Sequence, residues 1–160
     1  MSVLKKTLVL STAMGVVATL ALAGGHSASP QDRAVKARQS KMTLYAYNLG
    51  ILGAMAKGDA EYNSGAAGLA AANLAALTSV YMPGTWLPGT DNESIKNTAA
   101  LPKLWQDKPE EVGAKAQALS DAAQSLAKAA GTDLASLQGA IGPVGKACGG
   151  CHKAYRAEDD

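Results

Sequence analysis

Apolar residues recur every three or four positions along four stretches of this chain, a spacing that puts them on one face of an α-helix. No stretch shows the strict alternation of apolar and polar residues that is typical of a half-buried strand. The pattern predicts helices at about 30–57, 64–81, 103–130 and 134–155. Four amphipathic helices joined by mostly short links predict an all-α fold, an antiparallel four-helix bundle.

Residues that favour helix ends flank these stretches. Ser29 is suited to the N-cap of the first helix, with Pro30 at its first position and Asp32 placed for a capping box. Gly58 is suited to end that helix, and Asn63 to begin the second. The buried face of the first helix is expected to consist of Val35, Arg38, Met42, Tyr45, Leu49, Leu52 and Ala56.

Prolines and one long connection interrupt the helical pattern. Pro109 either kinks the third helix or marks its true start, and Pro143 is expected to bend the fourth. The buried stripe of the second helix should end at Tyr81, shortly before Pro83. The irregular segment from 82 to 102 is long for a small domain, and connections of that length commonly wrap over something.

The first 23 residues have the pattern of a secretory signal peptide. The positive pair Lys5-Lys6 precedes an uncharged apolar run at 7–22, which ends among small residues that a signal peptidase recognises. The run is shorter than the roughly 20 residues that span a bilayer. We therefore expect residues 1–23 to be removed on export, leaving one domain at 24–160 with no membrane anchor.

Composition adds two limits. The 160 residues include no Phe, and many of the apolar residues are Ala, so the core buries little area for each residue. A bound planar cofactor would add the missing apolar mass. Without the two lysines of the leader, the basic and acidic residues balance, and no basic run favours a nucleic acid partner.

The strongest chemical signal is Cys148-Gly149-Gly150-Cys151-His152, a CxxCH motif. Two thiols three positions apart on a helix can form thioethers with the two vinyl groups of a haem, and the next residue can bind its iron. The glycines allow the backbone to approach the porphyrin closely. The motif predicts one haem c, attached through Cys148 and Cys151, with His152 as an axial iron ligand.

Three other interpretations of the two cysteines explain less. A zinc site needs about four ligands, whereas the chain offers two Cys and two His, of which His26 lies near the leader cleavage point. A thioredoxin-like CxxC should follow a strand, and none is predicted. A disulfide of an exported protein would not account for the histidine that follows the second cysteine.

The second axial ligand decides the function. His26 lies too close to the cleavage point, which leaves Met42, Met55, Met82 or no protein ligand. Met42 lies in the middle of the predicted buried face of the first helix, whereas Met55 lies beside that face and Met82 beside a Pro-Gly stop. Met42 is therefore the candidate ligand, with ordinary core packing as the alternative.

Two arginines are candidates for the haem edge. Arg38 lies one turn before Met42 on an apolar stripe, where a guanidinium needs a partner such as a haem propionate, or a route to water. Arg156 lies four residues after His152, so both share a helix face. It could pair with a propionate, lie against the imidazole, or be favoured simply as a cation near a helix C-terminus.

The chain resembles the cytochrome c-prime family and its low-spin relatives, the cytochromes c-556. The resemblance rests on a CxxCH motif in the last of four helices and covers nearly all of the chain after the leader. The Thr85–Leu101 segment departs from it by its length. Further matching segments are Arg38-Gln39-Ser40-x-Met42, residues 52–59, Trp105, residues 144–148 and Tyr155-Arg156.

This resemblance implies a left-handed antiparallel bundle with the haem near one end and His152 as the solvent-side ligand. It implies Arg38 and Gln39 near the propionates, and Met42 at the distal haem face. In c-556 types a Met at that position binds the iron of a low-spin electron carrier. In c-prime types the residue only blocks the pocket, and the five-coordinate iron takes up nitric oxide or carbon monoxide. Many c-prime members are homodimers through their first two helices, whereas the low-spin forms are often monomers.

Together these features predict a periplasmic c-type cytochrome that carries single electrons between redox partner proteins and is not an enzyme. The alternative is a high-spin protein with an open distal site that binds nitric oxide or carbon monoxide. Export agrees with haem c, because bacteria attach covalent haem on the outer side of the inner membrane.

Overall fold

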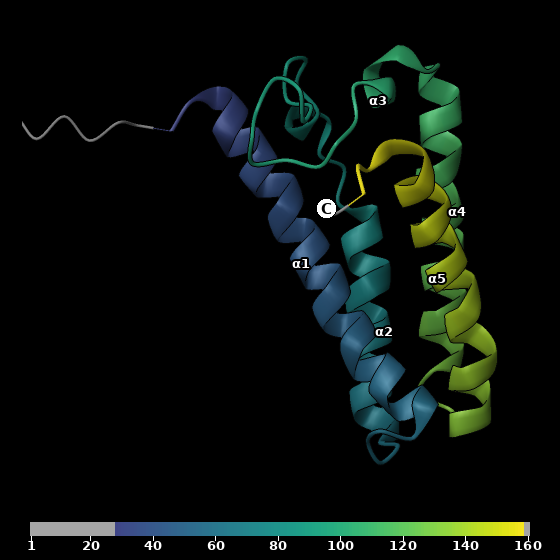
Figure 1. Ribbon diagram of the computed structural model, residues 1–160. Coiled ribbons are helices and arrows are strands. Elements are labelled where there is room, and N and C mark those ends of the chain that lie inside the picture. The colour runs from purple at the N-terminus through teal and green to yellow at the C-terminus, as the bar shows by residue number, and fades with distance from the viewer. Residues whose placement is uncertain (1–27, 159–160) are drawn as a thin grey trace, which may run out of the picture.

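The computed structural model describes residues 28–158 of the chain. In that range it contains five α-helices and one short 3-10 helix, with no β-strand, and none of the helices is long and apolar enough to cross a membrane (Figure 1). The predicted signal peptide at 1–23, and His26, lie outside the described residues. The helices are α1 at Pro30–Lys57, α2 at Ser64–Ser79, α3 at Lys103–Gln106, α4 at Pro109–Ala129 and α5 at Leu134–Tyr155, and the 3-10 helix η1 is at Pro83–Thr85.

α1 begins and ends at the predicted caps. The Ser29 hydroxyl accepts a hydrogen bond from the Asp32 backbone N–H at 3.0 Å, and the Asp32 carboxylate accepts one from the Ser29 backbone at 3.2 Å. These two bonds make a complete capping box. Gly58 ends the helix in the left-handed conformation, with φ 83°, which a residue with a Cβ adopts only at a cost.

α2 is shorter than predicted. It begins after the expected cap Asn63 but ends at Ser79 rather than Tyr81. The hydroxyls of Thr78 and Ser79 both donate to the backbone carbonyl of Ala75, so these side chains compete for an acceptor of the last turn. Tyr81 is 87% exposed, and the prediction that it closes the buried stripe is wrong.

Pro109 marks the start of a helix rather than a kink. The predicted third helix divides into the single turn of α3 and the longer α4, with Asp107 and Lys108 extended between them. Proline disfavours helical backbone in the residue before it and fits the first turn of a helix, where its missing N–H costs nothing. α5, in contrast, continues through Pro143.

The four long helices form the predicted all-α bundle, with α3 as an additional turn. α1 packs on α2, α2 on α4, and α4 on α5. α1 and α5 contact each other less closely, and α1 leans away from α5 toward the end of the bundle that carries the α2–α3 connection (Figure 1).

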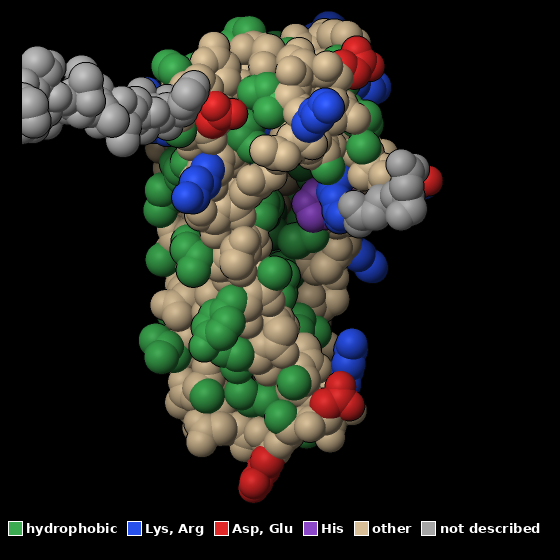
Figure 2. All heavy atoms as spheres, turned by 60° about the vertical axis from the view of Figure 1, so that its left-hand side comes forward, with side chains coloured by type: hydrophobic (Ala, Val, Ile, Leu, Met, Phe, Trp, Pro, Cys, Tyr) green, Lys and Arg blue, Asp and Glu red, His purple; other side chains and the backbone are tan. Residues whose placement is uncertain are grey.

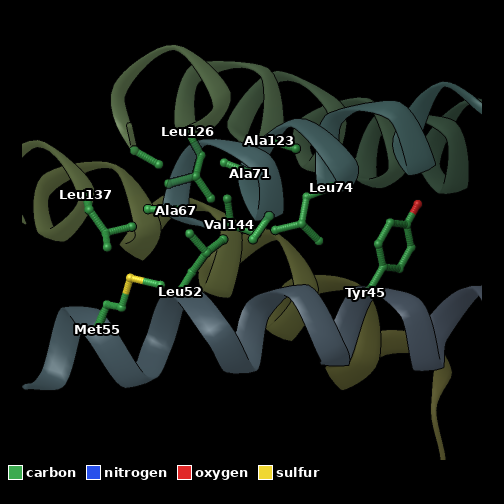
Figure 3. Packing of buried hydrophobic residues seen from close by; sticks show 12 residues of the cluster. Tyr45, Leu52, Met55, Ala67, Ala71, Leu74, Ala123, Leu126, Leu137 and Val144 are labelled. Atoms are coloured by element: carbon green, nitrogen blue, oxygen red, sulfur yellow. The ribbon is translucent and has the colours of Figure 1, made fainter. Parts of the chain in front are cut away.

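The hydrophobic core fills the bundle from the α1–α2 turn as far as Tyr45. On α1 the core cluster includes Leu52 and Met55 and contains no residue that precedes Tyr45 (Figure 3). The turn between α4 and α5 approaches α2 closely, because the Cα atom of Gly131 would lie 3.6 Å from a Cβ added at Gly68. The largest fully buried apolar side chains are Leu52, Leu74, Leu126, Leu137 and Val144.

Candidate functional site

α5 carries the CxxCH motif near its C-terminal end. Cys148 and Cys151 are half-buried, and neither forms a disulfide. Burial raises the pKa of both thiols above its usual value, so both are S–H groups at neutral pH. A Cβ added at Gly149 or Gly150 would meet no atom within 4 Å, so the helix backbone between the thiols is open to the approach of another group.

His152 follows the second thiol at the surface of α5. Partial burial and the neighbouring Arg156 guanidinium lower the pKa of its imidazole below the usual value of 6.5, so the ring is neutral at pH 7. The neutral ring is the form that binds a metal ion. His152 is exposed and is the only histidine of the described residues.

α1 faces the motif through Tyr45. This residue is buried, and its hydroxyl donates to the Leu77 carbonyl of α2 at 3.2 Å. Burial, with a smaller effect from the Cys148 thiolate, raises the pKa of Tyr45 to about 12. Cys148 packs against the same hydrophobic cluster that contains Tyr45. The inner face of α1 therefore meets α5 at the level of the motif.

Met42 lies on the same face of α1, about one turn from Tyr45 and one turn from Arg38. Arg38 is 4% exposed and Tyr45 is 8% exposed, yet Met42 between them is 41% exposed and does not belong to the core cluster. Met42 therefore lies outside the hydrophobic cluster that fills the rest of the bundle. A methionine thioether is one of the side-chain groups that bind haem iron in c-type cytochromes.

The other two candidate methionines are placed differently. Met55 is buried in the hydrophobic cluster near the C-terminal end of α1 (Figure 3), so it is a core residue. Met82 lies in the chain just before η1, and its carbonyl accepts a hydrogen bond from the Thr85 hydroxyl at 2.8 Å. Of the three, Met42 alone lies on α1 within about one turn of Arg38.

Arg38 is buried beneath the segment that joins α2 to α3. Its Nη1 donates to the Thr85 carbonyl at 3.1 Å and to the Thr90 hydroxyl at 2.7 Å. Its Nη2 donates to the Thr90 carbonyl and, at 2.8 Å, to the Thr98 hydroxyl. The alternative that Arg38 extends to water is wrong, because the protein itself supplies these partners. Burial lowers the pKa of Arg38 and the charge of Asp91 opposes this shift, and the guanidinium remains charged at neutral pH.

Two tryptophans and a neighbouring glutamine complete these surroundings. The Arg38 guanidinium lies 4.9 Å from the centre of the Trp86 ring and 5.8 Å from that of Trp105, within cation–π range. Trp105 Nε1 donates to the Trp86 carbonyl at 3.0 Å, and Gln39 donates to the Asn97 carbonyl at 2.5 Å. The long connection therefore wraps over the N-terminal half of α1, as its length predicts.

The C-terminal end of α5 is held by Tyr155, a contact that the sequence analysis missed. The Tyr155 hydroxyl donates to the Asp107 carboxylate at 2.9 Å, and Lys103 donates to the same oxygen at 2.5 Å. These hydrogen bonds, first that from Lys103 and then that from Tyr155, hold the pKa of Asp107 below its usual value. Lys103 and Asp107 have the i,i+4 spacing of a helical ion pair, but no periodic pattern signals Tyr155, which lies 48 residues further along the chain.

Asp107→Asn is expected to reduce the amount of stability that the protein loses at acidic pH. A carboxyl whose pKa is lowered by folding stabilises the fold above its unfolded pKa of about 3.9, and this contribution is lost as the pH falls through the lowered value. The melting temperature of the wild type should therefore fall more between about pH 5 and about pH 2 than that of the variant. Asp121→Asn, at an exposed carboxylate of α4, is the control. If the melting temperatures of the wild type and Asp107→Asn fall equally over this pH range, the Asp107 carboxylate does not stabilise the fold.

These residues together suit a covalently attached haem. The donor set consists of two S–H groups, a neutral imidazole beside them and a thioether on the facing helix, which matches haem c chemistry. Within residues 28–158, no group of three or more His, Cys, Asp or Glu side chains could hold a metal ion directly.

A family model described as Cytochrome C' matches residues 33–156 of the chain. This chain belongs to the cytochrome c' family. Members of that family carry one covalently attached haem c, so this chain is a c-type cytochrome with haem c as its cofactor.

Individual relatives are similar over most of their length. Cytochrome c-554 from Cereibacter sphaeroides is 42% identical over 94% of this chain and 96% of its own. The solved cytochrome c' from Rhodobacter Spheriodes superposes with a TM-score of 0.78 at 36% identity, covering 82% of this chain and 100% of that one. A second solved cytochrome c', with an unusual ligand-controlled dimer dissociation, has a TM-score of 0.73 at 31% identity and covers 82% and 99%. The predicted cytochrome c-prime family is confirmed.

Proposed function

We propose that this cytochrome c' family member is a periplasmic carrier of single electrons. Cys148 and Cys151 would hold the haem, and His152 and Met42 would be its axial iron ligands. The observation that carries the proposal is the exposed Met42, between two buried residues on the face of α1 that meets α5. A bound haem c supplies one-electron redox chemistry, and a methionine ligand raises its potential.

The other site residues would tune and orient this arrangement. Arg156 helps to lower the pKa of His152, which favours the neutral imidazole that binds iron. Arg38 and Gln39 would lie near the propionates. There the buried guanidinium would contribute a fixed positive charge that favours ionised carboxylates.

A gas-binding function is the second candidate. The exposure of Met42 also suits a side chain that only borders the distal pocket. The relatives include proteins named cytochrome c', one of which has a ligand-controlled dimer dissociation. In that case His152 would be the sole protein ligand, and the opposite side of the iron would take nitric oxide or carbon monoxide.

Absorption spectra of the purified holoprotein, oxidised and reduced, with and without carbon monoxide, separate the two functions. A sharp reduced α band that does not respond to carbon monoxide would support the electron carrier. A broad high-spin spectrum that changes when carbon monoxide is added would favour the gas-binding protein instead.

The periplasmic location rests on the leader predicted at residues 1–23. Its removal would release residues 24–160 into the compartment where haem c is attached and where redox partner proteins exchange electrons with it. Mass spectrometry of the exported holoprotein tests this directly, since a retained leader would contradict the predicted cleavage.

We further propose a homodimer formed through α1 and α2. No charged residue lies between Lys41 and Lys57 of α1, and none lies in α2. Large apolar side chains are nevertheless exposed there, namely those of Leu44, Tyr47 and Leu69. Figure 2 shows many hydrophobic side chains on the left and lower parts of this side of the bundle, with charged side chains at its upper rim, its right edge and its foot. A surface with this composition is typical of a protein interface.

Tyr47→Glu is expected to weaken this homodimer at least tenfold, by ~1.4 kcal/mol or more, because a carboxylate would be buried among apolar side chains. Sedimentation velocity over a range of concentrations measures the change. Gln117→Glu adds the same charge to an exposed position of α4 and should leave the dimer intact. A wild type that is monomeric at all concentrations would contradict the proposed dimer.

A further inference from the structure

Residues 85–101, called the strap below, are tied at one end to α1. Arg38 donates four hydrogen bonds to the strap, two from Nη1 and two from Nη2. Their acceptors are atoms of Thr85, Thr90 and Thr98. Three of these bonds are buried and the bond to Thr98 is partly buried. Because the donor is also charged, they are stronger than ordinary surface hydrogen bonds.

The other end of the strap is tied to α5. The Leu101 N–H donates to the Tyr155 carbonyl at 2.9 Å, and the Ala157 N–H donates to the Ala99 carbonyl at 2.8 Å, which makes a short antiparallel bridge. These bonds begin three residues after His152. The strap thus reaches the haem-motif helix immediately beyond the histidine.

The strap therefore connects two helices that contact each other only lightly. α1 and α5 are the least closely packed neighbours among the long helices, and the strap crosses the end of the bundle at which they diverge (Figure 1). Direct packing between α1 and α5 is sparse, so the strap bonds add a connection between these two helices at this end.

We propose that Arg38 is a positioning residue that, through the strap, fixes the separation of α1 from the C-terminal end of α5. The inference rests on the proposed haem site between these helices, and it applies whether Met42 binds the iron or only borders it. Release of the strap would let α1 move relative to α5, and Met42 would occupy the distal position for a smaller fraction of the time.

Amide hydrogen exchange of the holoprotein tests the anchor. In Arg38→Ala, exchange at the Leu101 and Ala157 N–H groups is expected to rise at least about tenfold, because both depend on a strap held at Arg38. Exchange at core amides of α4, such as Leu126, should change by less than about twofold. Arg33→Ala removes an exposed arginine of the same helix and is the charge-matched control, expected to change none of these rates.

Arg38→Lys separates positioning from charge. Lysine keeps the positive charge but cannot donate four N–H groups from one rigid plane. If Arg38 acts by position, the strap amides exchange nearly as fast in Arg38→Lys as in Arg38→Ala, and carbon monoxide is taken up several-fold faster by both than by the wild type. Wild-type exchange and uptake rates in Arg38→Lys would overturn the proposal and leave Arg38 a charge alone.

Thr98→Val tests the same anchor with the arginine in place. It removes the acceptor of one Arg38 bond, and also that of the Ala100 N–H at 3.2 Å, at nearly constant side-chain volume. Exchange at Leu101 and Ala157 should rise by a smaller factor, and no rise at all would overturn the proposal. The wild-type spectrum tests the proposed function separately: a high-spin wild type would contradict Met42 ligation, while the exchange rates would still decide the role of Arg38.

Discussion

Met42→Ala is expected to convert a six-coordinate low-spin iron to a five-coordinate high-spin iron and to open it to carbon monoxide. Removal of the thioether leaves His152 as the protein ligand, so carbon monoxide affinity should rise at least about 100-fold because no side chain competes for the iron. The reduction potential should fall by about 100 mV or more, since axial ligands tune haem potentials over roughly 0.8 V. Absorption spectra, electron paramagnetic resonance and a redox titration measure these changes.

Met55→Ala is the matched control for this experiment. Met55 is buried in the hydrophobic cluster, so its truncation should cost about 2–5 kcal/mol of stability through the cavity that it leaves. The spectrum of the folded Met55→Ala protein should be that of the wild type. A Met42→Ala protein that stays low-spin and does not bind carbon monoxide would remove Met42 from the ligand set.

Replacement of both Cys148 and Cys151 by Ser is expected to abolish covalent haem attachment. Two thioethers account for the covalent link in a CxxCH protein, so the haem that remains with the chain after acid–acetone extraction should fall at least about tenfold. Haem staining after denaturing electrophoresis provides the same measurement.

The single Cys148→Ser and Cys151→Ser variants are the controls. Each keeps one thiol and should retain covalent haem through a single thioether, with the reduced α band shifted by the remaining vinyl group. Covalent haem in the double variant would contradict the assignment of these two residues.

The ends of α1 could be predicted to the residue because their signals are local. Ser29 and Asp32 are three residues apart, and the left-handed Gly58 donates its N–H to carbonyls of the preceding turn, Ala54 and Met55. The end of α2 could not be predicted this way. The apolar period continues to Tyr81, while the hydroxyls of Thr78 and Ser79 bind a backbone carbonyl of the last turn.

The candidate site also has residues with local sequence signals and residues whose surroundings only the folded chain determines. Cys148, Cys151 and His152 share two turns of one helix, so their spacing alone indicates their chemistry. The partners of Arg38 lie 47 to 60 residues away in the chain, and no periodicity can pair residues across that distance. The exposure of Met42 depends on how far the core extends along α1, which is a property of the packed bundle.

The most direct test of the claim that Met42 binds the iron is NMR of the reduced holoprotein labelled with methyl carbon-13 methionine. The residues from 28 to 158 include three methionines, Met42, Met55 and Met82. If Met42 is the ligand, one methyl signal is shifted far upfield by the haem ring current, and that signal disappears in Met42→Leu. If every methionine methyl signal lies in the ordinary range, or the shifted signal survives in Met42→Leu, Met42 does not bind the iron.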